Sequence, residues 1–223
     1  MPKEIDFMSS LHKSTKRDYL ARVNDKEYPK ALAAKLAKKW DYDYWDGDRK
    51  INYGGYKYIP NRWNNVIKNL IEYYQLPKNP KILDIGCGKG FFLYDFLKIV
   101  PQADVYGIDI SSYAINNSKP DIREKLTLGN AIDLPWEDDY FDLVVSINTI
   151  HNLYTFEIEK ALFEMERVGK NKYLCVESYR NENEKVNLLY WQVTCEAFNT
   201  PEEWKWWFKH SNYNGEYSFI YFE

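Results

Sequence analysis

The residues of this 223-residue chain whose types and spacing point most directly to chemistry are those at 84–90, which read Asp-Ile-Gly-Cys-Gly-Lys-Gly. They lie between an apolar run at 81–85 and a helix-like segment at 91–100. Glycines at such a junction allow a tight turn and let backbone N–H groups approach a ligand, while the next helix presents its positive N-terminal end. The pattern therefore predicts a loop that binds a nucleotide-like ligand.

The spacing of the glycines distinguishes between classes of nucleotide site. A nicotinamide-dinucleotide fingerprint reads Gly-x-Gly-x-x-Gly, whereas here Phe91 follows a Gly-x-Gly-x-Gly pattern. A phosphate-binding P-loop needs a four-residue gap and a terminal Gly-Lys-Ser/Thr, which are also missing. Glycine-rich loops after a first strand are generic, however, so an NAD-dependent oxidoreductase stays open as an alternative.

Four ordered landmarks resemble the class I S-adenosylmethionine (SAM) dependent methyltransferases. The first is the acidic residue and glycine loop at 84–90, and the second is Asp109 at the end of the next apolar run. The third is Gly-Asn-Ala-Ile-Asp-Leu-Pro-Trp at 129–136, and the fourth is Phe-Asp-Leu-Val-Val-Ser at 141–146. The resemblance spans roughly 81–177 and implies a Rossmann-like fold, SAM as the cofactor and methyl transfer as the activity.

The same resemblance implies which residues bind SAM. Asp109 is expected to accept hydrogen bonds from both ribose hydroxyls, because an ionised carboxylate is an acceptor only. Asn130 departs from the aspartate usual at its position, yet its amide oxygen can accept from the adenine amino group while the Ala131 N–H donates to the ring. The full predicted cofactor set is Asp84, Gly86, Cys87, Gly88, Gly90, Asp109, Ile110, Asn130, Ala131 and Asn148.

Two residues are predicted to assist the chemistry. Transfer from a sulfonium is an in-line displacement, so positioning supplies much of the catalysis, and a general base helps when the acceptor is a hydroxyl or protonated amine. His151 is the first candidate base, because it follows the fourth predicted strand and histidine titrates near neutral pH. Glu177, at the end of the fifth predicted strand, is the second. A histidine that is only structural is the alternative for His151.

The acceptor-binding residues are predicted from an aromatic loop and one arginine. Tyr53, Tyr56 and Tyr58 lie in a glycine-punctuated loop that suits a substrate lid, and an aromatic face attracts a sulfonium. Arg180 is predicted to hold an anionic acceptor through its two-pronged guanidinium. The aromatic pairs at 42–45 and 53–56 resemble methyltransferases of bacterial surface-sugar pathways, which implies a polar small-molecule acceptor such as a sugar or phosphorylated precursor.

The elements that must position these residues alternate along the chain. Short apolar runs from residue 81 onward alternate with helix-like segments, which is typical of βα units and a parallel sheet. We predict an α/β fold with a Rossmann-like, doubly wound, mostly parallel sheet at 81–223 and a helical and aromatic N-terminal extension at 1–80 that belongs to the same domain. The predicted strands are 81–85, 105–110, 126–128, 141–147, 173–177 and 217–222, and the predicted helices are 27–39, 61–74, 91–100, 111–119, 157–168, 184–198 and 201–209.

Composition narrows the partners. The balance of 30 Lys+Arg against 33 Asp+Glu disfavours a broad contact with nucleic-acid phosphates, and no Pro-Pro-aromatic motif follows Asn148 as in base methyltransferases. The three cysteines match no paired spacing, and no carboxylate cluster suggests magnesium, so no metal site is predicted. No signal peptide or long apolar segment is evident, which predicts a cytoplasmic protein without membrane contact. A non-catalytic SAM-binding protein is the remaining alternative.

Overall fold

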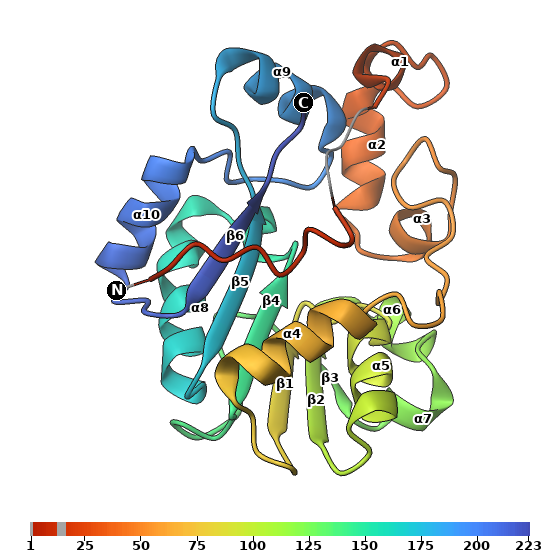
Figure 1. Ribbon diagram of the computed structural model, residues 1–223. Coiled ribbons are helices and arrows are strands. Elements are labelled where there is room, and N and C mark those ends of the chain that lie inside the picture. Colours follow the sequence, from red (N-terminus) through yellow and green to blue (C-terminus); the bar gives the residue numbers. More distant parts are fainter. Residues whose placement is uncertain (1, 13–16) are drawn as a thin grey trace.

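The computed structural model describes residues 2–12 and 17–223 of the chain and shows helices on both faces of a central sheet (Figure 1). The strands are β1 (Lys81–Ile85), β2 (Asp104–Asp109), β3 (Leu126–Leu128), β4 (Leu143–Ile147), β5 (Lys172–Glu177) and β6 (Glu216–Ile220). The helices are α1 (Tyr19–Val23), α2 (Lys30–Ala37), α3 (Tyr42–Trp45), α4 (Asn64–Tyr74), α5 (Phe91–Ile99), α6 (Ser112–Asn116), α7 (Pro120–Arg123), the 3₁₀ turn η1 (Ile150–Asn152), α8 (Thr155–Val168), α9 (Glu182–Trp191) and α10 (Pro201–His210).

The sheet has the order β3-β2-β1-β4-β5-β6, and every neighbouring pair of these strands is parallel. Buried side chains fill nearly every position of β4 and β5, as expected for strands covered on both faces. The prediction of a Rossmann-like α/β fold is confirmed. Because the strand order reverses between β1 and β4, the carboxyl ends of these two strands mark the expected ligand crevice.

Two apolar layers hold the sheet. On one face α4 and α5 bury Leu70, Phe92 and Phe96, and on the other α8 and α10 bury Met165 and Trp204. Complete burial of one such side chain contributes about 1.5–3 kcal/mol. Because these layers hold the sheet in place, they also fix the strand ends from which the loops at its carboxyl edge start.

The N-terminal segment lies along the open edge of β6. The Ile5 N–H donates to the Tyr217 carbonyl at 2.8 Å, and the Tyr217 N–H donates to the Lys3 carbonyl at 2.9 Å. Phe7 is buried and meets the ring of Tyr173 edge-on at 5.0 Å between centroids. Residues near the start of the chain are therefore integrated into the core and shield a sheet edge from pairing with another chain (Figure 1).

Two predicted helices differ from the observed ones by more than a few residues at their ends. The segment 111–119 forms only α6, and Pro120, expected to end a helix, also begins α7, since proline suits a first helical turn. The helix predicted at 184–198 ends at Trp191, and the following segment is extended. A contact with a distant part of the chain explains the earlier end of the helix, because the N–H groups of Glu196 and Ala197 donate to the carbonyl of His151 and not to carbonyls of a helix.

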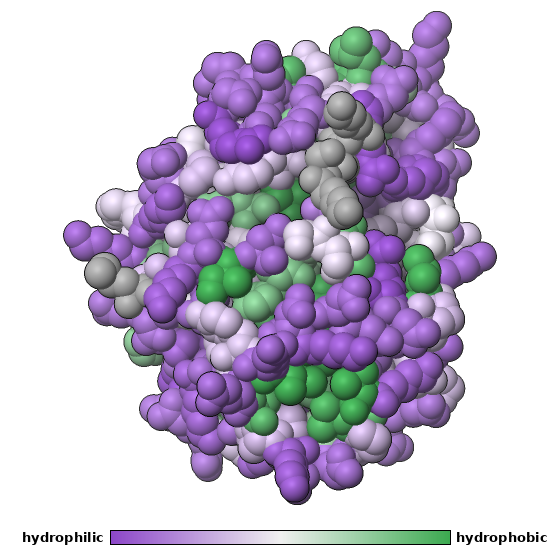
Figure 2. All heavy atoms as spheres, in the orientation of Figure 1, coloured by the Kyte–Doolittle hydropathy of each residue, from purple (hydrophilic) through white to green (hydrophobic). Residues whose placement is uncertain are grey.

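The face of the molecule that is seen in Figure 2 is mainly polar. Figure 2 shows one face on which hydrophilic side chains predominate and apolar side chains gather in separate patches, one of them below α4 in that view. No helix within residues 2–12 and 17–223 is long and apolar enough to cross a membrane.

Candidate functional site

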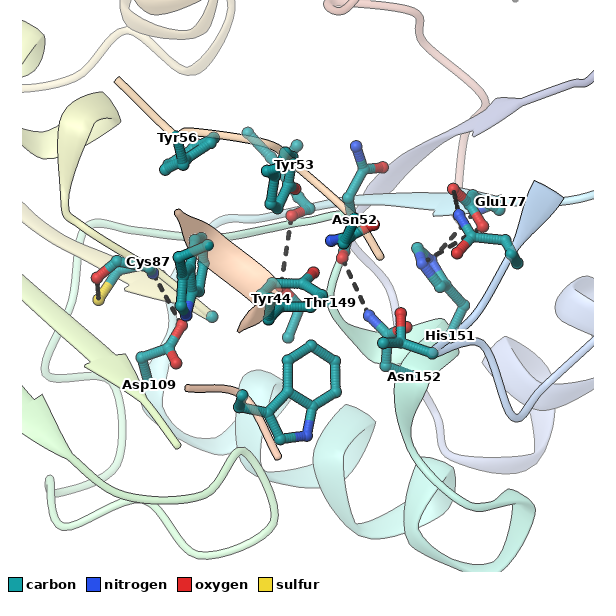
Figure 3. Close-up of a pocket in the computed structure, with 18 of the residues that line it drawn as sticks. Tyr44, Asn52, Tyr53, Tyr56, Cys87, Asp109, Thr149, His151, Asn152 and Glu177 are labelled. Carbon is teal, nitrogen blue, oxygen red and sulfur yellow. Dashed lines mark hydrogen bonds and ion pairs between the residues drawn. The ribbon is translucent and has the colours of Figure 1, made fainter. Parts of the chain in front are cut away.

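A cavity of about 890 Å³ opens at the carboxyl ends of β1, β2, β4 and β5. The glycine loop and Asp109 line one side, His151 and Glu177 line the other, and Tyr44 and Tyr53 lie between them (Figure 3). The structure thereby brings together residues that were predicted for cofactor binding, catalysis and acceptor binding. Those that line the cavity are Tyr53, Tyr56, Asp84, Gly86, Cys87, Gly88, Asp109, Ile110, Asn130, Asn148, His151 and Glu177.

The glycine loop leaves no room for side chains. Gly86 and Gly88 have positive φ angles of 77° and 55°, a region that other residues rarely adopt. A Cβ atom on Gly86 would lie 2.0 Å from Thr149 Oγ1, and one on Gly88 would lie 2.7 Å from the Trp45 ring. Gly90 also has a positive φ, but it precedes α5 and lies outside the cavity lining. The loop backbone is therefore the surface that a ligand in this part of the cavity meets.

Two buried carboxylates flank this loop. Asp109 accepts the Gly88 N–H at 2.7 Å and the Ser111 N–H at 2.8 Å. Burial raises the pKa of Asp84 to about 8, and the nearby charge of Asp109 acts in the same direction. Lys89 does not neutralise them, because its ammonium pairs with Asp46 at 2.6 Å. The pair is thus electrostatically suited to a ligand that carries positive charge.

His151 and Glu177 form a second buried pair. The Glu177 N–H donates to His151 Nδ1 at 3.3 Å, so the proton of the neutral ring is on Nε2, which lies 3.5 Å from Glu177 Oε2. Burial lowers the pKa of His151 to about 3 and raises that of Glu177 to about 8. The contact is therefore one between neutral groups, although its distance alone resembles that of an ion pair.

The pair leaves hydrogen-bonding capacity unused. Gln192 Nε2 donates to Glu177 Oε1, and the carbonyl of Glu177 accepts from Trp204 Nε1 at 3.0 Å. Within the described residues, Glu177 Oε2 and Asn152 Oδ1 are buried side-chain oxygens without a hydrogen-bond partner. Both residues line the cavity, and an unsatisfied buried acceptor is costly. A ligand with O–H or N–H donors would satisfy these oxygens.

The aromatic loop closes the cavity from above the glycine loop. Tyr53 stacks on Trp45 with centroids 5.6 Å apart, and Tyr56 stacks on Phe91 at 5.2 Å. Trp45 is held in place by a hydrogen bond from its Nε1 to Ser111 Oγ at 2.9 Å. The loop is tied to the same strand end that carries Asp109.

Two predicted acceptor residues lie elsewhere. The Tyr58 hydroxyl donates to Asp95 at 2.6 Å and does not line the cavity. Arg180 pairs with Glu184 and Glu223 and is likewise outside the lining, because these carboxylates already occupy its guanidinium. Ala131 is buried next to the lining residue Asn130 but does not line the cavity.

Sequence reasoning missed other lining residues. Gln192 was placed inside a predicted helix, and Trp45 was one aromatic residue among many in its loop. Arg17 and Arg49 also line the cavity, and no local pattern distinguishes them from surface arginines. The enrichment of aromatic residues in the loop was the one sequence feature that indicated a role for this segment in the site. Within residues 2–12 and 17–223, no cluster of His, Cys, Asp or Glu side chains is placed to hold a metal ion.

Comparisons with known proteins add to this geometry. A family model described as a methyltransferase domain matches residues 76–212. The chain is 31% identical over 135 residues to an uncharacterized protein of Methanocaldococcus jannaschii and 26% identical over 145 residues to a demethylmenaquinone methyltransferase of Symbiobacterium thermophilum. Each match covers 59% of this chain, and 55% and 57% of the two relatives, so the chain spans little more than half of their length.

The name of a third relative specifies a nucleic acid as its substrate. A tRNA (carboxymethyluridine(34)-5-O)-methyltransferase of Arabidopsis thaliana is 31% identical over 116 residues, which are 51% of this chain and 28% of that protein.

Solved structures share the fold. The YcgJ protein of Bacillus subtilis matches with a TM-score of 0.54 and 22% identity over 65% of this chain and 66% of that chain. The cyclase SpnF matches with a TM-score of 0.52 and 16% identity over 66% of this chain and 56% of that chain. At these identities the likeness concerns the fold alone, which hosts more than one chemistry.

Proposed function

This chain belongs to the SAM-dependent methyltransferases, and we propose that it methylates an oxygen or nitrogen atom of a polar small molecule. The family model covers 76–212, which includes the glycine loop, the two buried carboxylates beside it and the pair of His151 and Glu177. Membership makes the chain an enzyme and sets aside the NAD-dependent and non-catalytic alternatives. Family membership does not identify the methyl acceptor, and the proposal concerns this acceptor.

The cavity suits SAM as the methyl donor. We expect Asp84 to face the positively charged ammonium end, since its carboxyl is buried and the nearby charge that acts on it is that of Asp109. We expect Asp109 to accept from the ribose hydroxyls and Asn130 to hold the adenine, with Gly86 and Gly88 forming the floor. When bound, SAM supplies an electrophilic methyl group, and the chain supplies alignment and charge complementarity.

The observation that carries the proposal is the unpartnered oxygen of Glu177. Its Oε2 is buried, lines the same cavity as the glycine loop and lacks a hydrogen-bond partner within the described residues. An acceptor hydroxyl or amine would satisfy this oxygen and would be held by it. The ionised carboxylate would then take the proton that the acceptor loses as the new bond to the methyl group forms.

Glu177 replaces His151 as the proposed base. Both ring nitrogens of His151 face Glu177, since Nδ1 accepts its N–H and Nε2 lies beside its carboxyl. A histidine whose pKa burial lowers to about 3 is neutral at physiological pH, but its free lone pair is already used. We therefore assign His151 as a positioning residue that orients Glu177.

The proposal is tested by methyl transfer from methyl-labelled SAM to a panel of sugars, sugar phosphates and small amines. We expect labelled product with the full chain and a rate about 10²- to 10⁴-fold lower for Glu177→Gln, with unchanged SAM affinity. Glu182→Gln, which makes the same substitution at the exposed start of α9, is the matched control and should transfer normally.

One outcome would redirect the proposal. The Arabidopsis relative is named for carboxymethyluridine at position 34 of a tRNA, so tRNA that carries this modified base belongs in the same panel. The slightly acidic composition, with 33 acidic against 30 basic side chains, disfavours a nucleic-acid acceptor. Labelling of tRNA but of no small molecule would contradict the small-molecule assignment.

A further inference from the structure

Three arginines converge on one indole at the rim of the cavity. The guanidinium carbons of Arg17, Arg22 and Arg49 lie 5.1, 4.8 and 5.5 Å from the ring centroid of Trp191, the last residue of α9. They come from two segments of the chain, namely helix α1 with the residue before its N-cap Asp18, and the loop after α3. We call these four residues the arginine cluster. Like charges gathered on one ring repel, so the arrangement calls for a counter-charge.

No carboxylate supplies that counter-charge. Within residues 2–12 and 17–223, no acidic side chain forms a salt bridge with any of the three arginines. The nearby acids are used otherwise, since Asp18 caps the Ala21 N–H at 2.9 Å and Asp25 accepts the Tyr28 N–H at 2.8 Å. The cluster is thus a concentration of positive charge that no acidic side chain among the described residues neutralises.

The arginines are held in place through the backbone. Arg22 donates through Nη2 to the Ile51 carbonyl at 2.6 Å, and Arg49 donates through Nη1 to the Asn52 carbonyl. The Nε of Arg22 is buried and has no hydrogen-bond partner within the described residues. Burial, followed by repulsion from Arg49, lowers the pKa of Arg22 to about 10. Preorganised guanidinium groups with unused donors are suited to an oxyanion.

The cluster opens onto the cavity. Arg17, Arg49 and Trp191 line it, and Arg17 and Arg49 are exposed, which places their donors at the mouth. Tyr53 lines the same cavity and lies between the glycine loop and the pair of His151 and Glu177 (Figure 3). Gln192, the residue after Trp191, donates to Glu177. A molecule bound at Glu177 can therefore extend toward the arginine cluster.

We propose that the arginine cluster binds a phosphoryl group of the methyl acceptor and holds the acceptor's nucleophilic atom near Glu177. Three guanidinium groups match the roughly two negative charges of a phosphate monoester better than the single charge of a carboxylate. The proposal rests on the proposed methyltransferase function and narrows its acceptor to phosphorylated molecules. It also moves the anion-binding role, first predicted for Arg180, to the arginine cluster.

The test is calorimetric titration of inorganic phosphate, and separately of acetate, into the full chain in the presence of SAM. Phosphate is expected to bind in the millimolar range and acetate more weakly. The double variant Arg17→Gln/Arg49→Gln should weaken phosphate binding at least tenfold, whereas Arg123→Gln, which removes one arginine from α7 outside the cavity, should leave it unchanged. Arg49→Lys retains the charge without the fork and should give an intermediate affinity.

SAM affinity, measured in the same proteins without phosphate, separates the possible failures. If wild type binds SAM but no phosphate, or if the double variant binds phosphate as wild type does, the arginine cluster is not an anion site. If the double variant loses SAM affinity together with phosphate affinity, the cluster serves the cofactor's carboxylate and the acceptor assignment is wrong. Absence of SAM binding in every protein would instead contradict the proposed function itself.

Discussion

The proton on Glu177 decides what this residue can do. Burial among apolar and aromatic neighbours disfavours its charged form and raises its pKa to about 8. The carboxyl is therefore largely protonated at neutral pH in the free protein, and it can accept a proton only after ionisation. Binding of a positively charged donor beside it would favour the ionised form.

This leads to a prediction for the pH dependence of transfer. We expect the single-turnover rate with saturating substrates to rise with pH with a midpoint at or below pH 8, as the carboxylate of Glu177 forms. The Glu177→Gln variant should show no such rise. A rise centred near pH 6.5 that persists in the variant would point to a histidine instead.

Stability changes in the opposite direction over this range. The fold favours the protonated form of Glu177, so its contribution is full below the ordinary carboxyl pKa of 4.5 and is lost as pH rises toward 8. Circular dichroism at each pH is therefore the control that separates a falling rate from unfolding.

In the glycine loop between β1 and α5, side chains of other segments approach the backbone closely. Trp45 packs on it so tightly that a Cβ on Gly88 would lie 2.7 Å from the indole. Gly88→Ala should therefore lower SAM affinity about tenfold or more, with a backbone cost of about 1–2 kcal/mol from its positive φ. Calorimetry on Gly88→Ala and on Gly88→Ala/Trp45→Ala measures this. If removal of the indole restores no affinity, the clash is not the cause.

Strands and the glycine loop were predictable because their signals are local. The apolar runs at 81–85 and 173–177 and the glycine spacing at 84–90 need no knowledge of distant contacts, and the structure has β1, β5 and the turn there. The end of α9 was not predictable, because residues 192–197 leave the helix to bond with His151 and Glu177.

The candidate site was predictable only where it lies on the sheet. Asp84, Asp109 and Glu177 end strands whose carboxyl ends must share an edge, so their convergence follows from topology. Arg180 was misplaced because its partner Glu184 lies one helical turn away and competes for the guanidinium. Arg17 and Arg49 meet at Trp191 through the path of the N-terminal segment, which no periodicity encodes.

At the scale of the whole molecule, the start of the chain stabilises the sheet that carries the site. Phe7 is buried against Tyr73, Tyr74 and Tyr173. Phe7→Ala should reduce the free energy of unfolding by about 3–5 kcal/mol, since it leaves a cavity at the edge of the core. Urea denaturation followed by tryptophan fluorescence gives this value. A loss below about 1 kcal/mol would mean that the segment is only loosely attached.

Both the proposed methyl transfer and the proposed acceptor site require that SAM binds in the crevice between the glycine loop and Asp109. Calorimetric titration of SAM into wild type and Asp109→Ala tests this directly. Loss of a carboxylate that accepts two hydroxyl hydrogen bonds should cost about 2–4 kcal/mol, allowing for partial replacement by water. We predict that Asp109→Ala binds SAM about 30- to 1000-fold more weakly while it keeps its fold by circular dichroism. An affinity within about threefold of wild type would contradict the assignment of this crevice as the SAM site.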